Sequence, residues 1–560
     1  MNISVPEAAL RLGKSQATIR RLLAGGQIAG QKVGGRWIVH AEKLPHLPSV
    51  STAAGADRPR IDVRLALRQL RRTDIRDLWV PDVLKWEDYA QEPSEVLAAA
   101  QAKCSTGQSD EVIVVNIPKG PHLSRAGSLL SLEDRIAYHA LCATFAEEAE
   151  KRLSDRVYSS RLNANQRAGL FKSGIDQWKK FNETTNREVR TAGPWMAKTD
   201  LVSYFETISH KVLFQELTLL QVPEDIKRPL RELLRGWRFE TQHGIPIGPD
   251  ASRLLGNIFM MRVDETMLDE GWNYWRYMDD IRIIANSERE AVRALRRLEV
   301  LCRTRGLLLS SPKTKVGEYP MGGATDDDSL DLADYFFRNG LDEARKAIRK
   351  ILHSSLLDKS IKTRHARFAL VRLGALVDRA VLAKILRRLD RLKEASPESA
   401  LYLRSFISET AVQQEITAYL AGPGEPGVEE YQQAWLLAAM LEVLGDPPRE
   451  WIIYAWRITQ DANNPSYLRS LAANLVALGK DPEHLAWLRK TAIENYNPAL
   501  VRGTLVALAR AGELRQPIVD SAVSRHTQLR CTAEYLRSRA SLPSLIQVGL
   551  WSRVREVSNT

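Results

Sequence analysis

Hydrophobic positions repeat with different periods in three parts of this 560-residue chain. In residues 1–45, two short helix-like runs precede a stretch of alternating apolar and polar positions. From about 110 to 320, strand-like runs rich in β-branched residues mix with helical periodicity. After about 335, helical periodicity dominates and no stretch is convincing as a strand. Because strands repeat every two residues and helices about every 3.6, the pattern predicts a multidomain α+β protein with an all-α C-terminal part.

The first 46 residues are predicted to form a separate small domain. Helices are expected over 4–12 and 15–23, and each is followed by glycine. The alternation over 27–39 predicts a hairpin that turns at 34–35.

Two helices, a tight turn and a hairpin resemble the winged helix-turn-helix of excisionase- and MerR-type proteins. In that family the second helix enters the major groove of DNA. The resemblance implies DNA contacts by six polar or basic residues: Gln16, Thr18, Arg20, Arg21, Lys32 and Arg36. The alternative is a domain that has lost DNA binding and serves as a docking module. Residues 47–60 are mostly small and polar and are bounded by prolines, which predicts a flexible linker.

Two adjacent carboxylates stand inside an apolar run in the middle of the chain. Tyr277-Met278-Asp279-Asp280 is flanked by β-branched and aromatic residues, which predicts a hairpin with the acids at its turn. Two such acids repel each other unless they share a cation, usually Mg²⁺. A surface turn with two solvated acids is the alternative.

A third carboxylate lies upstream, where a short predicted strand over 196–200 ends at Asp200. Between Asp200 and Asp279 stands a Gly/Pro-rich loop over 243–249, which a predicted helix follows. Glycine permits close approach of the backbone to a ligand, and the start of a helix favours negative charge. Three acids and such a loop suit two-metal nucleotidyl transfer.

The order of these segments resembles the palm of a reverse transcriptase over about 110–320. Asp200 with Phe205 resembles motif A, and the tetrapeptide ending in Asp280 resembles motif C. Further matches are Gly244-Ile245-Pro246-Ile247-Gly248 with Ser252 and Asn257 for motif B, 305–314 with Lys313 for motif D, and finger segments at 117–119 and 132–136.

The resemblance implies roles for individual residues. Asp200, Asp279 and Asp280 would be the catalytic metal ligands for two Mg²⁺ ions, with Mn²⁺ as a substitute. Phe205 would lie under the incoming sugar and favour dNTPs over rNTPs. Contacts to the dNTP are expected from Phe205, Ile247, Gly248, Lys313, Lys119 and Arg135. An ordinary core Phe and a solvated surface Lys are the alternatives for Phe205 and Lys313.

Ile247 departs from the family pattern, because most templated reverse transcriptases carry Gln at this position. The Ile-Gly-Pro sequence is more similar to bacterial defence-type enzymes, including the abortive-infection group. Similarity to some of these enzymes implies DNA synthesis without a conventional template. Several of these enzymes also carry a C-terminal helical-repeat domain.

Self-similarity in the C-terminal part supports that comparison. Asn464-Pro465 and Asn497-Pro498 repeat at an interval of 33 residues, as do Gly479 and Gly512. Such a period predicts stacked helix pairs that resemble degenerate HEAT- or armadillo-type repeats. A helical thumb with extra helices is the alternative. The predicted domains are therefore 1–46, the linker 47–60, fingers and palm over 61–335, and thumb and repeats over 336–560.

Composition and charge indicate which binding partners and which cellular compartment are expected. Net charge is +12 and the pI about 9.4, which favours a polyanion such as nucleic acid. No apolar run approaches the ~18–20 residues that span a bilayer, and no signal peptide is recognised, so a cytoplasmic protein without membrane contact is expected. Four cysteines without a Cys-x-x-Cys pair are expected to be buried thiols. Whether the chain forms a homo-oligomer is left open.

Three functions compete at this point. The first is an RNA-directed or template-independent DNA polymerase that uses dNTPs in antiphage defence or abortive infection. The second is a retron- or mobile-element-type enzyme that copies a specific structured RNA or noncoding RNA. The third is a DNA-binding transcriptional regulator with an inert polymerase domain. Primer and template are not identified by the sequence.

Overall fold

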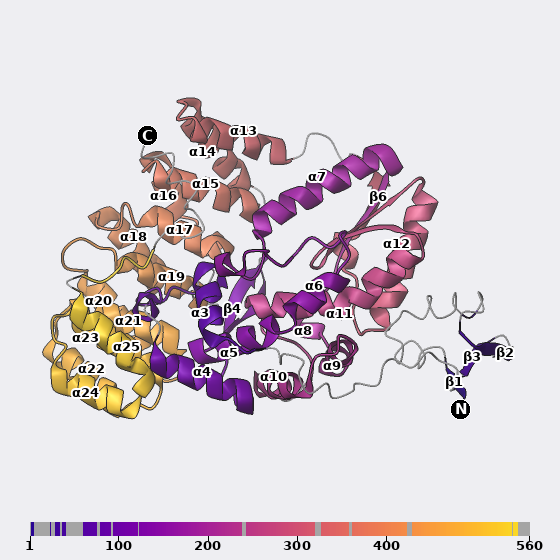
Figure 1. Cartoon of the computed structure of the whole chain (residues 1–560). Coiled ribbons are helices and arrows are strands. Elements are labelled where there is room, and N and C mark those ends of the chain that lie inside the picture. The colour runs from indigo at the N-terminus through magenta and orange to yellow at the C-terminus, as the bar shows by residue number, and fades with distance from the viewer. Residues whose placement is uncertain are drawn as a thin grey trace. The chain divides into compact units, whose positions relative to one another are not determined.

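The computed structural model describes residues 2–4, 23, 28–33, 36–40, 60–74, 79–90, 93–120, 122–237, 242–319, 326–357, 361–422, 428–539 and 541–546. The chain divides into two compact units, whose elements are labelled in Figure 1. Unit 1 comprises residues 1–72, 99–111 and 130–323, and unit 2 comprises 73–98, 112–129 and 324–560.

The N-terminal segment forms a three-stranded antiparallel sheet with the order β1-β3-β2. Its strands are β1 (Asn2–Ser4), β2 (Gly30–Val33) and β3 (Arg36–His40). Val33 pairs with Arg36, so β2 and β3 form the predicted hairpin, and its turn at 34–35 lies outside the described residues. Ser4 belongs to β1 and pairs with Ile38, so the predicted start of a helix at this residue is wrong.

The six candidate DNA contacts are only partly covered by the described residues. Lys32 lies in β2 and Arg36 in β3, on the predicted hairpin. The other four fall outside the described residues: Gln16, Thr18, Arg20 and Arg21.

The centre of unit 1 is a four-stranded antiparallel sheet with the order β7-β8-β6-β9. Its strands are β6 (Trp195–Asp200), β7 (Asn273–Tyr277), β8 (Asp280–Ala285) and β9 (Lys315–Glu318). Five consecutive residues of β8, from Ile281 to Ala285, are buried, as expected for a strand covered on both faces.

Helices cover this sheet and complete unit 1. The helices against its strands are α7 (Gly174–Ala192), α11 (Asp250–Asp269) and α12 (Glu288–Arg303). The other helices are α3 (Val63–Arg72), α5 (Leu132–Ala143), α6 (Ala146–Arg152), α8 (Tyr204–Thr207), α9 (His210–Leu219) and α10 (Glu224–Trp237). Helix α4 (Ser94–Thr106) is shared between the two units.

Unit 2 is mainly helical, and its described part after residue 335 contains no strand, as predicted. Its helices are α13 (Asp326–Arg338), α14 (Glu343–Leu357), α15 (Thr363–Ala375), α16 (Leu382–Leu386), α17 (Ser396–Leu403), α18 (Thr410–Ala421), α19 (Glu430–Met440), α20 (Arg449–Gln460), α21 (Ser466–Leu478), α22 (Pro482–Glu494), α23 (Pro498–Arg510), α24 (Gln516–Arg525) and α25 (Arg530–Ser538). Residues 326–328, three consecutive aspartates, form the first turn of α13.

Every second helix of unit 2 belongs to one continuous row, in which α15, α17, α19, α21 and α23 contact one another in series. The two Asn-Pro pairs of the 33-residue interval stand at the N-termini of α21 and α23 in this row. The two helices approach closely at Gly503, where an added Cβ would lie 2.3 Å from the Cβ of Ser470. The tryptophans of the helices of unit 2 pack against the hydrophobic core, and Trp451 is fully buried.

A hairpin from the predicted fingers belongs to the helical unit. Strands β4 (Ile113–Lys119) and β5 (Leu123–Leu129) pair with each other, and β4 contacts α19. The indole N–H of Trp435 donates to the Trp79 carbonyl at 3.2 Å, within the same unit. The contiguous domain ranges stay a prediction, whereas the compact units interleave along the chain.

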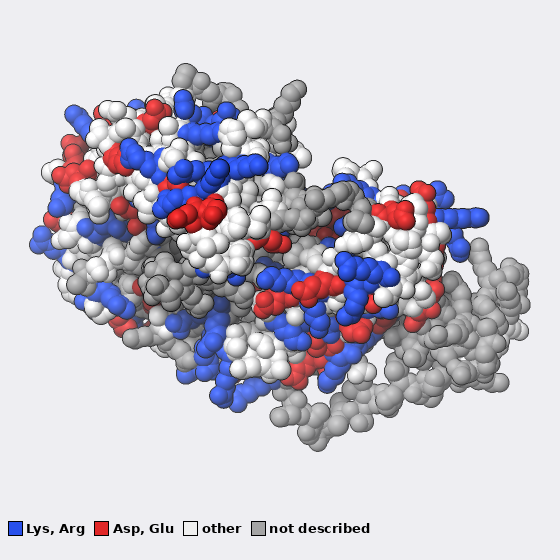
Figure 2. Space-filling view, turned by 90° about the horizontal axis from the view of Figure 1, so that it is seen from above, with Lys and Arg blue, Asp and Glu red and all other residues white. Residues whose placement is uncertain are grey.

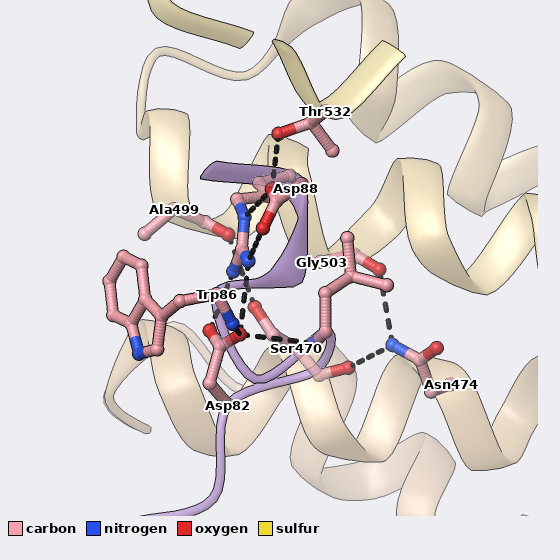
Figure 3. Close-up of polar contacts among 10 residues, drawn as sticks. Asp82, Trp86, Asp88, Ser470, Asn474, Ala499, Gly503 and Thr532 are labelled. Carbon is pink, nitrogen blue, oxygen red and sulfur yellow. Dashed lines mark hydrogen bonds and ion pairs between the residues drawn. The ribbon is translucent and has the colours of Figure 1, made fainter. Parts of the chain in front are cut away.

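Arg502 holds a second early segment against the row of helices. Its guanidinium contacts the carboxylates of Asp82 (2.6 Å) and Asp88 (2.7 Å), which converge in Figure 3. The Thr532 hydroxyl donates to Asp88 at 2.7 Å. Since Arg502 is only 6% exposed, two carboxylates surround a buried cation, and residues 82–88 are tied to α23.

Candidate active site

The central sheet of unit 1 brings the predicted carboxylates together from two distant parts of the chain. Asp200, the last residue of β6, pairs directly with Asp280, the first residue of β8. Tyr277 also pairs with Asp280, so Met278 and Asp279 form a two-residue turn between β7 and β8. The predicted hairpin is therefore confirmed, with Asp279 in its turn and Asp280 in the first position of β8.

The turn has an unusual backbone conformation. Met278 has φ of 56°, in the left-handed region that costs energy for a residue other than glycine. A positive φ at the first central position is typical of the tight turns that join twisted antiparallel strands. Surrounding contacts must therefore hold this turn in place.

The segment after Asp200 is paired with the predicted motif D. The Ser310 N–H donates to the Asp200 carbonyl at 2.8 Å, and the Val202 N–H donates to the Leu308 carbonyl at 2.9 Å. This pairing brings Lys313, at the end of a short 3₁₀ turn, to the site. Its ammonium group forms an ion pair with Asp200 Oδ2.

The Gly/Pro-rich loop is bonded to the residues around Phe205. The Ile245 N–H donates to the Phe205 carbonyl, and the Gly244 N–H donates to the Ile208 carbonyl, both at 2.8 Å. Gly244 has φ of 85° and Gly248 has φ of 127°, so both use backbone conformations that favour glycine. Ile247 is 8% exposed in this loop, and Phe205 is partly exposed.

Helix α11 approaches both Phe205 and the turn. A Cβ added to Gly256 would lie 3.2–3.3 Å from Tyr204, Phe205 and the sulfur of Met278. The Tyr204 hydroxyl donates to the Gly256 carbonyl at 2.5 Å. The segments assigned to motifs A, B and C thus meet at one glycine of α11.

Burial raises the pKa of Asp280, and the neighbouring Asp279 raises it further, while Arg282 and Lys198 lower it. The Nε atom of Arg282 lies 3.8 Å from Asp280 Oδ1. Cationic neighbours therefore offset only part of the cost of burying this carboxylate.

Two buried arginines stand beside the tetrapeptide and were not among the predicted site residues. Arg276 is fully buried and pairs with Asp264 at 2.6 Å, while Arg282 is 6% exposed and donates to Thr185 and Asn182. Each stands beside apolar or aromatic residues in its strand. A charged residue within a buried strand is the sequence signal that could have revealed them, because such a residue needs a partner.

Two of the predicted dNTP contacts, Arg135 and Lys119, differ from the others in their surroundings. Arg135 is buried, and Lys119 belongs to unit 2. Arg135 is 4% exposed within α5, so its burial does not favour contact with a triphosphate. Lys119 is exposed at the end of β4, in unit 2.

The donor set around Asp200 partly fits a divalent cation. Asp200 Oδ1 is buried and has no hydrogen-bond partner, and carboxylate oxygens are the ligands that Mg²⁺ prefers. Within the described residues, however, no group of three or more His, Cys, Asp or Glu side chains is gathered as a metal site. The ion pair of Lys313 with Asp200 Oδ2 supplies a positive charge at that oxygen instead.

The cysteines and the helices bear on the predictions of buried thiols and of no membrane-spanning segment. The four thiols are free; Cys104, Cys142 and Cys302 are buried, as predicted, and Cys531 is partly exposed. Among the helices of the described residues, none combines the length and apolarity needed to cross a membrane.

Comparison with known proteins assigns two segments of the chain. Residues 130–348 match the family described as reverse transcriptase (RNA-dependent DNA polymerase). Residues 3–44 match the helix-turn-helix domain family. The chain therefore carries a reverse transcriptase domain and an N-terminal helix-turn-helix domain.

No curated protein matches the chain. Among solved structures, a telomerase from Candida albicans in complex with a TWJ fragment of telomeric RNA matches with 12% identity and a TM-score of 0.29. The match covers 60% of this chain and 66% of the telomerase chain, just under two thirds. So weak a likeness defines neither the fold nor the activity of this chain.

Proposed function

We propose that this chain is a DNA polymerase of the reverse transcriptase class, with Asp200, Asp279 and Asp280 at its active site. The observation that carries the proposal is the direct pairing of Asp200 with Asp280, next to a turn that holds Asp279. The family match over 130–348 supports the same reaction class. The reaction joins a hydroxyl oxygen to the α-phosphorus of a dNTP and releases pyrophosphate.

The three carboxylates would hold Mg²⁺, or Mn²⁺ in its place. When bound, these ions lower the pKa of the attacking hydroxyl and neutralise charge on the triphosphate. The buried and unpartnered Oδ1 of Asp200 supports a role for this residue as a ligand.

Other side chains would orient the nucleotide and move a proton. Phe205 is partly exposed beside Gly256 and would lie under the deoxyribose, where a 2′-hydroxyl would clash. Lys313 would leave its ion pair with Asp200 and donate a proton to the departing pyrophosphate. Gly248 would allow the backbone of the loop to approach the dNTP.

The first experiment removes one proposed ligand. Purified Asp279→Ala protein, given each dNTP with Mg²⁺, should incorporate label only at background level, because the remaining ligands cannot position the cation. The matched control is Asp225→Ala, which removes an exposed carboxylate at the start of α10. Wild-type incorporation by Asp279→Ala, with full activity in the control, would contradict the site assignment.

We further propose that the enzyme is of the antiphage defence type and synthesises DNA without a conventional template. Ile247 in the loop supports this, since its buried aliphatic side chain cannot make the polar contacts of Gln. The row of helices in unit 2 supports a HEAT-like repeat domain. A retron-like enzyme that copies a bound RNA is the alternative.

Sequencing the product of a reaction without added template separates these possibilities. Random or homopolymeric DNA supports untemplated synthesis. A defined sequence that disappears after ribonuclease treatment of the protein supports a bound RNA template and contradicts the proposal. Loss of phage protection in cells expressing Asp279→Ala would test the defence role.

The N-terminal domain is proposed to bind DNA rather than to act only as a docking module. The family match over 3–44 supports this role. Replacement of Arg20 and Arg21 by Ala should weaken binding of duplex DNA and reduce its salt dependence. Unchanged binding by a folded double variant would favour the docking module.

The net charge of +12 agrees with nucleic acid as the partner of the whole chain. Figure 2 shows Lys and Arg side chains distributed over the visible face, interspersed with Asp and Glu.

A further inference from the structure

A buried ion pair lies directly beneath the turn that carries Asp279. Arg276, in β7, is fully buried, and its Nε and Nη2 atoms donate to the two oxygens of Asp264 at 2.8 and 2.6 Å. Asp264 lies on α11 and also accepts from the Tyr274 hydroxyl at 2.9 Å. A two-point contact of this kind fixes the plane of the guanidinium group.

The remaining arm of this guanidinium reaches the turn. Nη1 of Arg276 donates to the Met278 carbonyl at 3.0 Å and to Asn257 Oδ1 at 3.0 Å. Asn257, also on α11, donates through its own amide to the Ser159 carbonyl at 2.7 Å. One guanidinium therefore connects the turn to α11, and Asn257 extends the connection to a third segment.

The contacted carbonyl belongs to the residue with the strained backbone. Met278 has φ of 56°, and its carbonyl forms the peptide bond to Asp279. The orientation of that peptide plane helps to determine where the Asp279 carboxylate points. A charged donor that holds the carbonyl thus opposes relaxation of the turn.

We propose that Arg276 is a positioning residue that sets the direction of the Asp279 carboxylate toward a divalent cation. The inference rests on the proposed function and deepens it, because it assigns the geometry of the site to a residue that touches neither nucleotide nor cation. Asp264 orients Arg276, and Arg276 orients the turn. Contacts of this kind around metal ligands typically change metal affinity or activity by about 10- to 100-fold when removed.

The Arg276→Lys variant distinguishes a residue that positions the Asp279 carboxylate from one that only stabilises the fold. Lysine keeps a positive charge beside Asp264, but a single ammonium cannot bond in a plane to Asp264, Asn257 and the Met278 carbonyl together. A second variant, Arg276→Gln with Asp264→Asn, removes both charges at once and leaves no uncompensated buried ion.

The matched control is Arg502→Lys. Arg502 is likewise a buried arginine with carboxylate partners, Asp82 and Asp88, but all of them belong to unit 2. The same loss of planar bonding there should affect stability without changing the response to metal.

Two readouts are needed, with the unfolding midpoint as a check on the fold. The first is the Mg²⁺ concentration that gives half-maximal dNTP incorporation, together with separate kcat and KM values for dNTP. The second is Mn²⁺ binding followed by electron paramagnetic resonance, which requires no turnover, with Asp279→Ala defining the binding that belongs to the site.

Arg276→Lys and the double variant should require about 10-fold more Mg²⁺ and bind Mn²⁺ correspondingly more weakly. The fall in kcat should exceed any rise in KM for dNTP, and Arg502→Lys should match the wild type in both readouts. Wild-type metal dependence in either folded Arg276 variant would overturn the inference. If the wild type binds Mn²⁺ at the site but incorporates no dNTP, the proposed polymerase function fails, and Mn²⁺ binding still decides the role of Arg276.

Discussion

Arg276 and Arg502 are both buried arginines paired with aspartates, yet their partners come from very different distances along the chain. Arg276 bonds to Asp264 and Asn257, which lie 12 and 19 residues before it. Arg502 bonds to Asp88 and Asp82, which lie 414 and 420 residues before it. The first cluster supports one turn within a continuous segment, whereas the second joins an early segment of the chain to a late helix. The same chemistry thus serves a local site in unit 1 and long-range assembly in unit 2.

The largest expected effect comes from removing the charge of Arg502. Arg502→Leu leaves Asp82 and Asp88 buried without their cation, which should lower the free energy of unfolding by about 3–5 kcal/mol. Urea denaturation followed by tryptophan fluorescence measures the change.

Arg489→Leu is the control for this prediction. Arg489 is 37% exposed in its ion pair with Glu513, so its loss should cost much less stability than the loss of Arg502. Equal costs for the two substitutions would mean that burial does not distinguish these pairs.

A smaller effect is expected where α21 and α23 approach each other. The methyl group of Gly503→Ala would overlap Ser470, so the helices must separate, at a cost of about 1–3 kcal/mol. The thermal unfolding midpoint of unit 2 should fall, and Ser470→Gly in the same chain should restore part of the loss.

Gly256→Ala gives the corresponding comparison in unit 1. Its methyl group would meet flexible side chains at 3.2–3.3 Å, so it should cost less stability than Gly503→Ala but alter dNTP incorporation through Phe205 and Met278. A larger stability loss at Gly256 than at Gly503 would reverse the comparison.

The smallest expected effect is a pH dependence of the stability that Arg502 contributes together with Asp82 and Asp88. Burial alone would raise the pKa of Asp82, but the ion pair with Arg502 and two backbone N–H groups hold that pKa below its ordinary value of 3.8. A carboxyl whose pKa is lower in the folded state stabilises the fold above its unfolded pKa and loses that contribution as the pH falls through the folded pKa.

The stability difference between wild type and Asp82→Asn should therefore be largest near neutral pH and shrink below about pH 4. Unfolding free energies measured from pH 7 to pH 2.5 give this difference, with exposed Asp446→Asn as the control. A difference that stays constant across this range would show that the charge of Asp82 does not stabilise the cluster.

Local patterns predicted the secondary structure of the candidate site well. The strand that ends at Asp200, the hairpin that turns at Asp279 and the helix after the Gly/Pro-rich loop all occur. Each depends on side-chain alternation, turn residues or helix-start residues within a few positions of one another. Such patterns also predicted the N-terminal hairpin, but not β1, whose pairing partner lies more than 30 residues away.

Local patterns say little about a side chain whose surroundings come from distant segments. Arg135 has the charge to bind a triphosphate, yet the packing of α5 buries it. The hairpin β4–β5 has an ordinary strand pattern, which does not reveal that it packs in the helical unit.

The sequence by itself determined that Asp200, Asp279 and Asp280 stand at the ends of strands, in an order that resembles a reverse transcriptase. It also determined the helical character of the C-terminal part, because hydrophobic periodicity is a local property of the chain. Only the tertiary structure placed Asp200 opposite Asp280, set Arg276 beneath the turn and tied Asp82 and Asp88 to Arg502. Those contacts depend on burial and on the closure of long loops. The residues next to Asp200, Arg276 or Arg502 in the sequence do not indicate which distant group each of them contacts.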